Sequence, residues 1–393
     1  MRRYSQNLAR DLAKQVHEKG EDAVCAMLEQ CIEDGDIKPA EFSIRELAEE
    51  LVEDGHEWVQ TLDPRRRGRH HLMEADAVKT TAFANITGQI VYSTVMQAFA
   101  DEQFVFSAIV PTQQTQLSGE KIPGITGLGD VMEAVGEAQD YPVLTVGQDW
   151  ITTPETVKRG GIVPVTREAI FFDRTGLLTQ QASAVGHWMG YNKEVRIIDC
   201  IIDENTTAHR YVRRDIAMGA TYGDNSGDHD FDNLSASTSL VDWTDIEAVE
   251  LLLAAITDPN TGAPVIVQGK HVVVTPQLVH TAKYIFTATQ IAVQAGGFAT
   301  SGNLWRTNAP NVLDNYQILS SRLLAQRMAT DTSWFLGDVA MAFKYMENWG
   351  IETTTSDRMS DDAFKRDIVV AYKVSERGAA ATVEPRAIAK ATA

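Results

Sequence analysis

The feature of the sequence that most constrains the fold is one long segment of helical periodicity, from Thr175 to Asp203. Its apolar positions recur at three-, four- and seven-residue steps, as on one face of a helix; they are Leu178, Val185, Trp188, Val195, Ile198 and Ile202. At 1.5 Å per residue, a helix of about 28 residues is about 40 Å long. We therefore expect a rigid strut rather than an ordinary packing helix.

The size and composition of the chain favour a folded protein with more than one core. Of its 393 residues, 44% are hydrophobic, which suits roughly two or three packed units whose burial offsets the entropy of ordering. No apolar run approaches the roughly 20 residues that cross a bilayer, so we expect no membrane partner. Polar and acidic residues follow the start, Met1-Arg2-Arg3, instead of the apolar stretch of a secretion signal. This favours a cytoplasm-like compartment.

The segments before the strut differ in character. Residues 1–60 predict helices, with Ser43 and Glu46 as a capping box, but the segment is charged and breaks at Asp63-Pro64. We expect an arm with few core residues there. An apolar stripe predicts a helix from Phe83 to about Asp101, and Phe104 to Val110 predicts a strand.

The stretch that leads directly into the strut predicts an extended loop that ends in a hairpin. Residues 117–140 are rich in glycine, and two strand-like runs follow, at 148–158 and 162–166. Arg159-Gly160-Gly161 joins these runs. Paired glycines supply the positive φ of a tight hairpin turn.

The segments after the strut predict a mixed α/β region. Residues 221–239 are a polar loop, and Thr244 with Glu247 predicts a capping box for the next helix. A strand at 271–274 leads into Thr275-Pro276, an N-cap followed by proline at the first position of a helix through about Phe286. Further predicted strands lie at 316–319, 334–336, 339–345, 366–375 and 380–385.

The charge of the chain argues against a surface that grips nucleic acid. The formal net charge is −19, whereas a protein that binds DNA phosphates normally carries a strong basic patch. A negative net charge suits a container, because its wall should not adsorb the polyanion packed inside it. Simple colloidal solubility explains most of these carboxylates equally well.

The sequence carries no motif that makes a positive case for catalysis or for a cofactor. Cys25, Cys31 and Cys200 form neither a disulfide framework nor a zinc motif. Gly127-Leu128-Gly129 lacks the third glycine of a dinucleotide fingerprint. We find no phosphate loop, zinc-protease helix or nucleophile elbow. We therefore expect no enzyme activity and no cofactor, although a site assembled in space is left open.

Asp228, Asp230 and Asp232 have the alternate spacing of a calcium loop. The glycine position of that loop holds Asn233, and the position of the bidentate glutamate holds Ser239. A solvated acidic loop is the favoured interpretation, with weak cation binding as the alternative.

Two basic clusters are candidate contact sites. Arg65, Arg66 and Arg67 lead into Gly68, Arg69 and two histidines. This run needs counter-charge, from nucleic acid or an acidic neighbouring subunit, unless it is a solvated hinge. Residues 209–214 mix basic and aromatic side chains, which is a weak signal for nucleic-acid binding and favours a surface or interface. The tryptophans at 150, 188, 243, 305, 334 and 349 are interpreted as core or subunit-contact residues.

Three segments together resemble the Hong Kong ninety-seven-type capsid fold of tailed-phage major capsid proteins. The run Val157 to Ile170 with Asp173 and the strut looks like the end of the extended loop, a strand with Thr-x-Glu, an Asp cap and the spine helix. The run Gly269 to Pro276 resembles the strand-to-helix entry of the axial region. The runs Phe364 to Gly378 and Val383 to Arg386 resemble the closing strands. The resemblance covers about residues 78–390, and its specificity lies in the order and spacing of these segments.

The resemblance implies an α+β fold with a peripheral and an axial domain. The implied divisions are an N-terminal extension, the first part of the peripheral domain, the extended loop with its hairpin, the spine with more of the peripheral domain, the axial domain and the closing strands. The N-terminal extension is 1–77, the first part of the peripheral domain 78–116 and the extended loop with its hairpin 117–170. The spine with more of the peripheral domain is 171–265, the axial domain 266–360 and the closing strands 361–393. In relatives, a region such as 1–77 is either a removable scaffold-like segment or a retained arm.

The resemblance also implies a function in assembly. The chain would form pentamers and hexamers of an icosahedral shell in a bacterial host cytoplasm, enclose double-stranded DNA that it contacts weakly, and become part of the virion. Portal, scaffold or decoration proteins would be further partners. Some relatives form a Lys–Asn bond between subunits, for which Lys121 and Lys158 are possible donors. The candidate assembly contacts are Lys121, Trp150, Lys158, Arg159, Glu168, Arg65, Arg66 and Arg67.

Two alternatives stay open. An encapsulin-type nanocompartment shell has the same fold, but its region before the first core helix is normally much shorter than residues 1–77. A soluble multidomain enzyme would instead form a small oligomer with a cleft built from histidine and acidic residues.

Overall fold

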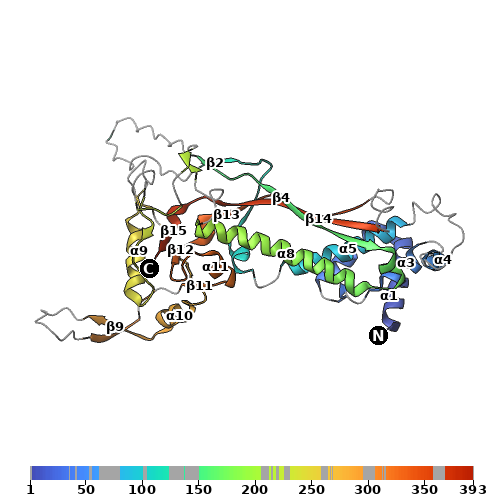
Figure 1. Ribbon diagram of the computed structural model, residues 1–393, viewed down its shortest axis with the longest axis horizontal. Helices are drawn as coiled ribbons and strands as arrows, with labels where there is room; N and C mark the ends of the chain where they lie inside the picture. Colours follow the sequence, from blue (N-terminus) through green and yellow to red (C-terminus); the bar gives the residue numbers. More distant parts are fainter. Residues whose placement is uncertain are drawn as a thin grey trace, which may run out of the picture. The chain divides into compact units, whose positions relative to one another are not determined.

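The computed structural model (Figure 1) divides the chain into two compact units. It describes residues 2–34, 36–39, 42–52, 55–61, 80–100, 104–123, 137, 150–204, 212–213, 216–217, 221–224, 231–257, 264–265, 267, 269–294, 306–311, 313, 316–356 and 368–392. No helix within these ranges has the length and apolar character that a bilayer crossing requires. Unit 1 consists of Met1–Glu102, Lys158–Asn192 and Trp349–Arg377, and unit 2 consists of Gln103–Val157, Lys193–Asn348 and Gly378–Ala393.

Unit 1 is built from helices around strand segments. Its helices are α1 (Arg2–Lys19), α2 (Glu21–Glu33), α3 (Ile44–Leu51), α4 (Gly55–Thr61), α5 (Thr80–Phe99) and α7 (Arg167–Phe171). Strand β4 (Val157–Thr166) pairs with β14 (Ile368–Thr382) in a four-stranded sheet of order β1-β13-β14-β4. The other two members are β1 (Thr112–Gln114) and β13 (Phe343–Thr355). Strand β1 belongs to unit 2, as do parts of β13 and β14.

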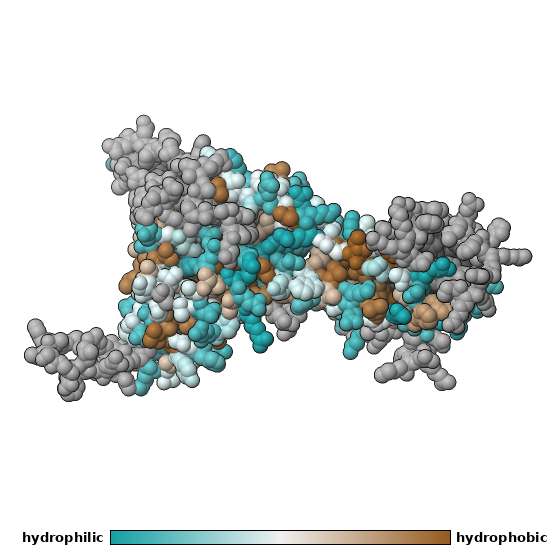
Figure 2. Space-filling model, in the orientation of Figure 1, coloured by the Kyte–Doolittle hydropathy of each residue, from teal (hydrophilic) through white to brown (hydrophobic). Residues whose placement is uncertain are grey.

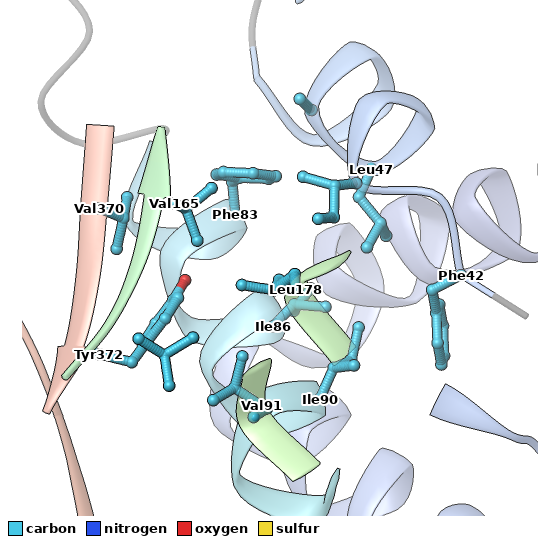
Figure 3. Packing of buried hydrophobic residues seen from close by; sticks show 14 of the residues in the cluster. Phe42, Leu47, Phe83, Ile86, Ile90, Val91, Val165, Leu178, Val370 and Tyr372 are labelled. Carbon is cyan, nitrogen blue, oxygen red and sulfur yellow. The ribbon is translucent and has the colours of Figure 1, made fainter. Parts of the chain in front are cut away.

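The N-terminal helices supply core residues to unit 1, so the expectation of an arm with few core residues is wrong. Phe42 is 4% exposed and Leu47 is 1% exposed. Both belong to one cluster with Phe83 and Ile86 of α5 and with Leu178, and Figure 3 shows these side chains converging. The apolar residues of residues 1–60 therefore cover the same core as α5. These apolar residues are divided among short helices, and so few in each helix give no clear sign in the sequence that they belong to a core.

The expected strut is confirmed as α8 (Thr175–Ile202), a helix of 28 residues. Its first part lies in unit 1, where Leu178 and Ala182 are buried, and its last part lies in unit 2, where Ile197, Ile198 and Ile201 are buried. The helix expected from Phe83 is also confirmed, as α5. Both have apolar residues at three- and four-residue steps, a pattern that local sequence encodes.

The expected hairpin at Arg159-Gly160-Gly161 is wrong, because β4 runs straight through these residues. Neither glycine is among the positive-φ residues of the described chain. A Cβ on Gly160 would instead lie 2.2 Å from the carbonyl oxygen of Val374 in β14. The glycine permits a close approach between two strands, which is the second common use of glycine in a sheet.

Unit 2 is built on a five-stranded sheet of order β11-β8-β12-β15-β7. These strands are β11 (Gln317–Leu319), β8 (His271–Val273), β12 (Trp334–Gly337), β15 (Ile388–Ala391) and β7 (Leu234–Ser235). Strand β12 is antiparallel to both neighbours, whereas β11 with β8 and β15 with β7 are parallel pairs. The remaining strands of unit 2 are β2 (Lys121–Pro123), β3 (Trp150–Thr152), β5 (Val212–Arg213), β6 (Ile216–Ala217), β9 (Gln290–Gln294) and β10 (Arg306–Pro310).

Helices pack against both faces of this sheet, and each face has its own hydrophobic core. One core joins Val272 and Trp334 to α9 (Trp243–Ala255) and α10 (Val279–Thr287). The other joins Val273 and Phe335 to the end of α8 and to the short helices. These short helices are α6 (Val105–Ile109), α11 (Arg322–Arg327), α12 (Val339–Ala342) and the 3-10 turn η3 (Pro385–Ala387). Alternate strand residues face opposite cores, as the period of a strand requires.

The strand expected at Phe104 to Val110 is wrong, because these residues form α6. The carboxylate of Glu194 accepts hydrogen bonds from the backbone N–H groups of Phe106 (2.9 Å) and Ser107 (2.7 Å) and from the Ser107 hydroxyl (2.6 Å). A side chain of α8 thus satisfies the first turn of α6. The segment contains no capping signal of its own.

The expected capping box of the helix after residue 240 lies two residues earlier than predicted. Asp242 caps α9 and Asp245 completes the box, in place of Thr244 and Glu247. Similarly, Thr275 does not cap α10, which begins at Val279 after Leu278. The Thr275 hydroxyl donates instead to the carbonyl oxygen of Asp331 at 2.7 Å.

Two strand predictions near the C-terminus are corrected. Residues 339–342 form α12, because the Asp338 carboxylate accepts from the N–H groups of Ala340 and Met341. The continuous strand β14 (Ile368–Thr382) contains the described part of the strand expected at 366–375 and the first residues of the one expected at 380–385, and the last strand is β15.

Candidate assembly surfaces

Lys121 and Trp150 lie together on the antiparallel pair β2–β3. The register places Pro123 opposite Trp150 and Lys121 opposite Thr152. The Lys121 ammonium lies over the Trp150 ring, 5.2 Å from its centroid, a distance at which a cation is attracted to the ring face. The structure therefore brings two of the expected contact residues into one group on unit 2.

The base of this pair is fixed to the loops beside it by threonine hydroxyls. The backbone N–H of Glu120 donates to the Thr153 hydroxyl at 2.8 Å, and the N–H of Thr153 donates to the carbonyl of Glu120 at 2.9 Å. The Thr115 hydroxyl donates to the Glu120 carboxylate. Ile151, between these contacts, is 1% exposed in the core of unit 2.

Lys158, Arg159 and Glu168 are exposed residues of unit 1. Lys158 and Arg159 lie on β4. Glu168 lies in the first turn of α7, where the positive end of the helix dipole stabilises a carboxylate. The Thr166 hydroxyl caps α7 by accepting from the Ala169 N–H at 3.3 Å. The remaining candidates, Arg65, Arg66 and Arg67, lie outside the described residues.

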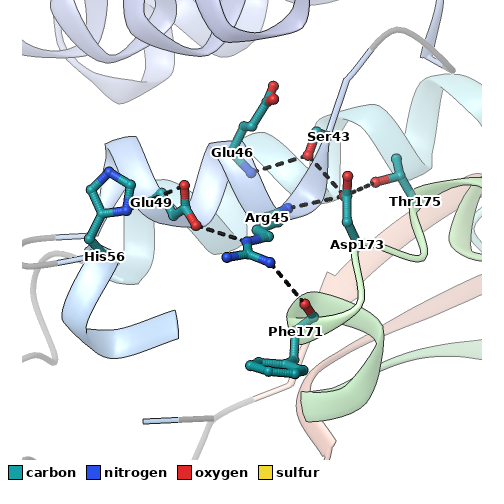
Figure 4. A network of polar contacts seen from close by, with 8 residues as sticks. All are labelled: Ser43, Arg45, Glu46, Glu49, His56, Phe171, Asp173 and Thr175. Atoms are coloured by element: carbon teal, nitrogen blue, oxygen red, sulfur yellow. Dashed lines mark hydrogen bonds and ion pairs between the residues drawn. The ribbon is translucent and has the colours of Figure 1, made fainter. Parts of the chain in front are cut away.

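Asp173 links the N-terminal helices to the start of α8, a role that sequence analysis did not assign to it. Its Oδ1 accepts hydrogen bonds from the hydroxyls of Ser43 and Thr175, both at 2.8 Å. The N–H of Ile44 donates to the Thr175 hydroxyl at 3.0 Å. Figure 4 shows this network, in which Arg45 also donates to the carbonyl oxygen of Phe171 at 3.4 Å. Ser43, the predicted cap of α3, accepts from the Glu46 N–H, which is one half of the expected capping box.

Only part of the calcium-like loop lies within the described residues. Asp228 and Asp230 lie outside the described residues, and the Asp232 carboxylate accepts from the Leu234 N–H at 3.2 Å. The described part of the chain contains no group of three or more histidine, cysteine or acidic side chains that could hold a metal ion. Asn233 is fully buried and binds backbone groups of two segments.

Charged residues with a partner at the end of α8, some of them buried, were also missed from the sequence. Arg327 forms a bidentate ion pair with Asp199, with Nε 2.6 Å from Oδ1 and Nη2 2.7 Å from Oδ2. Lys390, which is 8% exposed, pairs with Glu204 at 2.7 Å. Burial raises the pKa of Glu194, against the opposing effect of its hydrogen bonds. These partners are far apart in sequence, so no spacing could have signalled them.

The tryptophans expected as core or contact residues differ in burial, and Trp305 lies outside the described residues. Trp334 is fully buried in unit 2. Trp188 is 59% exposed on α8 and lines an open groove of about 630 Å³ in unit 1 with Gln97 and His187.

Comparison with known families decides what kind of protein carries these surfaces. The profile of a family described as phage capsid protein matches residues 150–391. The chain belongs to the phage capsid protein family. The matched region contains β3, β4, the spine helix α8, the five-stranded sheet of unit 2 and the closing strands β14 and β15 of the capsid protein. None of the curated proteins matches the capsid protein.

Solved structures give further likenesses to the capsid protein. A protein of Gordonia phage Cozz is 15% identical with a TM-score of 0.42, covering 75% of this chain and 87% of its own. A protein of Mycobacterium phage Adephagia is 16% identical with a TM-score of 0.43, covering 76% and 89%. The virus-like particle from Pyrococcus furiosus is 11% identical with a TM-score of 0.39, covering 77% and 98%. The assignment of the capsid protein to its family rests on the match over residues 150–391.

Proposed function

We propose that this chain is the major capsid protein of a tailed phage and builds an icosahedral shell around double-stranded DNA. The family match over residues 150–391 carries the proposal. The order of elements supports it, because β4, α7 and α8 follow one another as the Hong Kong ninety-seven-type resemblance implies. The acidic net charge of −19 suits a wall that contacts packed DNA weakly.

The chain acts through contacts between folded subunits rather than through chemistry on a substrate. Exposed Lys158, Arg159 and Glu168 on unit 1 and the Lys121–Trp150 group on unit 2 are contact residues in this proposal. Arg65, Arg66 and Arg67 provide positive charge for an acidic neighbour. Residues 117–170 reach a neighbouring subunit, and 266–360 gather around the symmetry axes. Pentamers and hexamers form in the bacterial host cytoplasm, together with portal, scaffold or decoration proteins.

Electron microscopy of the expressed full-length chain tests the proposal. We expect closed shells, alone or with the other head proteins of the phage present. A monodisperse small oligomer under both conditions contradicts the proposal and favours a multidomain enzyme.

The contents of particles isolated from infected cells test the finer statement. We expect double-stranded DNA, measured by nuclease protection and gel electrophoresis. Particles that hold a protein cargo and no DNA would identify a nanocompartment shell instead.

A further inference from the structure

We propose that the outward side of α9 in one subunit binds the outward side of α10 in a second copy of this chain. The α9 face consists of Glu247 and Leu251 with the preceding Val241, and the α10 face consists of His280, Lys283 and Tyr284. The inference rests on the proposed shell function and names surfaces through which neighbouring subunits meet.

The α9 face exposes apolar side chains on a helix that is apolar on both sides. Ile246 and Val249 are fully buried against the sheet, yet Leu251, on the opposite side, is 64% exposed and Val241 is 70% exposed. Figure 2 shows hydrophobic residues at the surface in the region of α9. Exposed large apolar side chains next to polar ones are typical of a contact surface, so this face is expected to gain a cover.

The α10 face has the composition of an interface. Ala282 and Ile285 bury the inner side of α10, and Tyr284 is 77% exposed on the outer side. Lys283 and His280 are exposed beside it. Tyrosine combines a large apolar ring with a polar end, which is why it is enriched where proteins meet.

The charges of the two faces select α10 as the partner of α9. Helix α9 carries Asp245, Glu247 and Glu250 and no basic residue. Asp245 completes its capping box and Glu250 accepts a hydrogen bond from the Tyr316 hydroxyl, so Glu247 is the acidic side chain of the outward face. Helix α10 carries His280 and Lys283 and no acidic residue. Two α9 faces would repel each other, whereas an α9 face and an α10 face are complementary. The complementarity therefore favours a head-to-tail contact over a symmetric pair.

The positions of the helices on their sheet allow this contact to repeat. Both helices share the core on one side of the five-stranded sheet. Helix α9 packs against β12 and β15, and α10 packs against the edge strand β11. One subunit therefore presents both faces at once, on different parts of the same layer. A head-to-tail contact that closes after a rotation makes a ring, in which every α9 face and every α10 face is covered.

Charge reversal tests the pairing directly. We make Glu247→Lys and Lys283→Glu as single variants of the chain. Each is expected to lower the fraction of chain in shells about tenfold or more, because a tenfold change corresponds to a loss of about 1.4 kcal/mol per contact. The double variant restores an acidic–basic pair and is expected to recover much of that loss. The readouts are sedimentation velocity and negative-stain microscopy, with circular dichroism to establish that each variant is folded.

Two further variants complete the experiment. Leu251→Glu places a charge on the apolar part of the α9 face and is expected to block shells while the folded subunit persists. Glu18→Lys makes the same charge change at an exposed position of α1 in unit 1 and is expected to assemble normally.

The outcomes separate this inference from the shell function itself. If the unaltered chain forms no shells, the shell function is wrong. If the unaltered chain, Leu251→Glu and both charge variants all form shells equally well, the shell function stands and the α9–α10 contact is wrong. If the variants form shells but lose a decoration protein, that protein is the occupant and the proposal is overturned. A double variant no better than the single variants also overturns the pairing.

Discussion

The side chain of Asn233 connects two segments of unit 2 that are about 150 residues apart in the sequence. Its amide nitrogen donates to the carbonyl oxygens of Thr221 (3.1 Å) and Pro385 (3.0 Å), and its amide oxygen accepts from the N–H of Gly223 (2.9 Å). The residue is fully buried. One amide therefore satisfies backbone groups that would otherwise be buried without partners.

Substitution of Asn233 tests this role. Asn233→Asp keeps the shape but removes both donors and adds a buried charge, so we expect the free energy of unfolding to fall by at least about 1–3 kcal/mol. Chemical denaturation of dissociated subunits measures the change. Asn192→Ala, which removes an exposed local hydrogen bond to Trp188, is the control and is expected to change stability by less than about 0.5 kcal/mol. Equal effects of the two variants would contradict the role.

His271 makes the stability of unit 2 depend on pH. Its Nδ1 accepts a hydrogen bond from the Val339 N–H at 3.3 Å, so the folded state needs the neutral ring. Burial lowers the pKa of His271 below its usual 6.5, and Lys270 lowers it further while Asp338 opposes the shift. The unfolded state therefore binds a proton more readily than the folded state does.

The sign of the pH dependence follows from this difference. The contribution of His271 to stability is present above pH 6.5 and is lost as the pH falls through the lowered pKa. We expect the unfolding free energy of the unaltered chain to decrease more between pH 7 and about pH 5 than that of His271→Gln. His17→Gln, at an exposed histidine of α1, is the control variant. Parallel profiles for the unaltered chain and His271→Gln would exclude this account.

At the scale of elements, helices α1–α4 are part of the folded core of unit 1. Val24 and Leu28 of α2 are fully buried, and Leu47 of α3 is 1% exposed. The Asp173 network ties α3 to the start of α8. A segment with this burial cannot leave the subunit without exposing the apolar surface of α5.

We therefore expect residues 1–61 to be retained in the assembled shell. Leu47→Ala should lower the free energy of unfolding by about 2–5 kcal/mol, whereas Leu177→Ala, at a side chain that is 44% exposed on α8, should have a small effect. Mass spectrometry of purified shells should find the N-terminal helices in the subunit. A mature subunit that begins beyond residue 77 would refute this expectation.

At the scale of the whole molecule, the net charge of −19 opposes the approach of identical subunits. Added salt shortens the Debye length from about 30 Å at 0.01 M to about 10 Å at 0.1 M, which screens long-range repulsion more than close contacts. We expect the rate of shell formation, followed by light scattering, to rise over this range of salt. A rate that falls steadily over the same range would show that attraction between unlike charges dominates the approach.

The sequence by itself determined the elements whose signal is local. The spine helix α8 and helix α5 follow from apolar residues that recur at three- and four-residue steps, because a helical face is set by residues three and four apart. Local capping was read correctly at Ser43, where the side chain and its partner are three residues apart. Order and spacing of such segments were also enough to indicate the family.

Only the tertiary structure decided features whose partners are distant in sequence. Helix α6 forms because Glu194, 88 residues away from Phe106, caps its first turn, and no local pattern contains that information. Gly160 admits the Val374 backbone of β14 rather than forming a turn, and Asn233 holds the closing segment rather than a cation loop. In each case the energy of a side chain depends on which distant backbone group lies beside it, and folding alone supplies that neighbour.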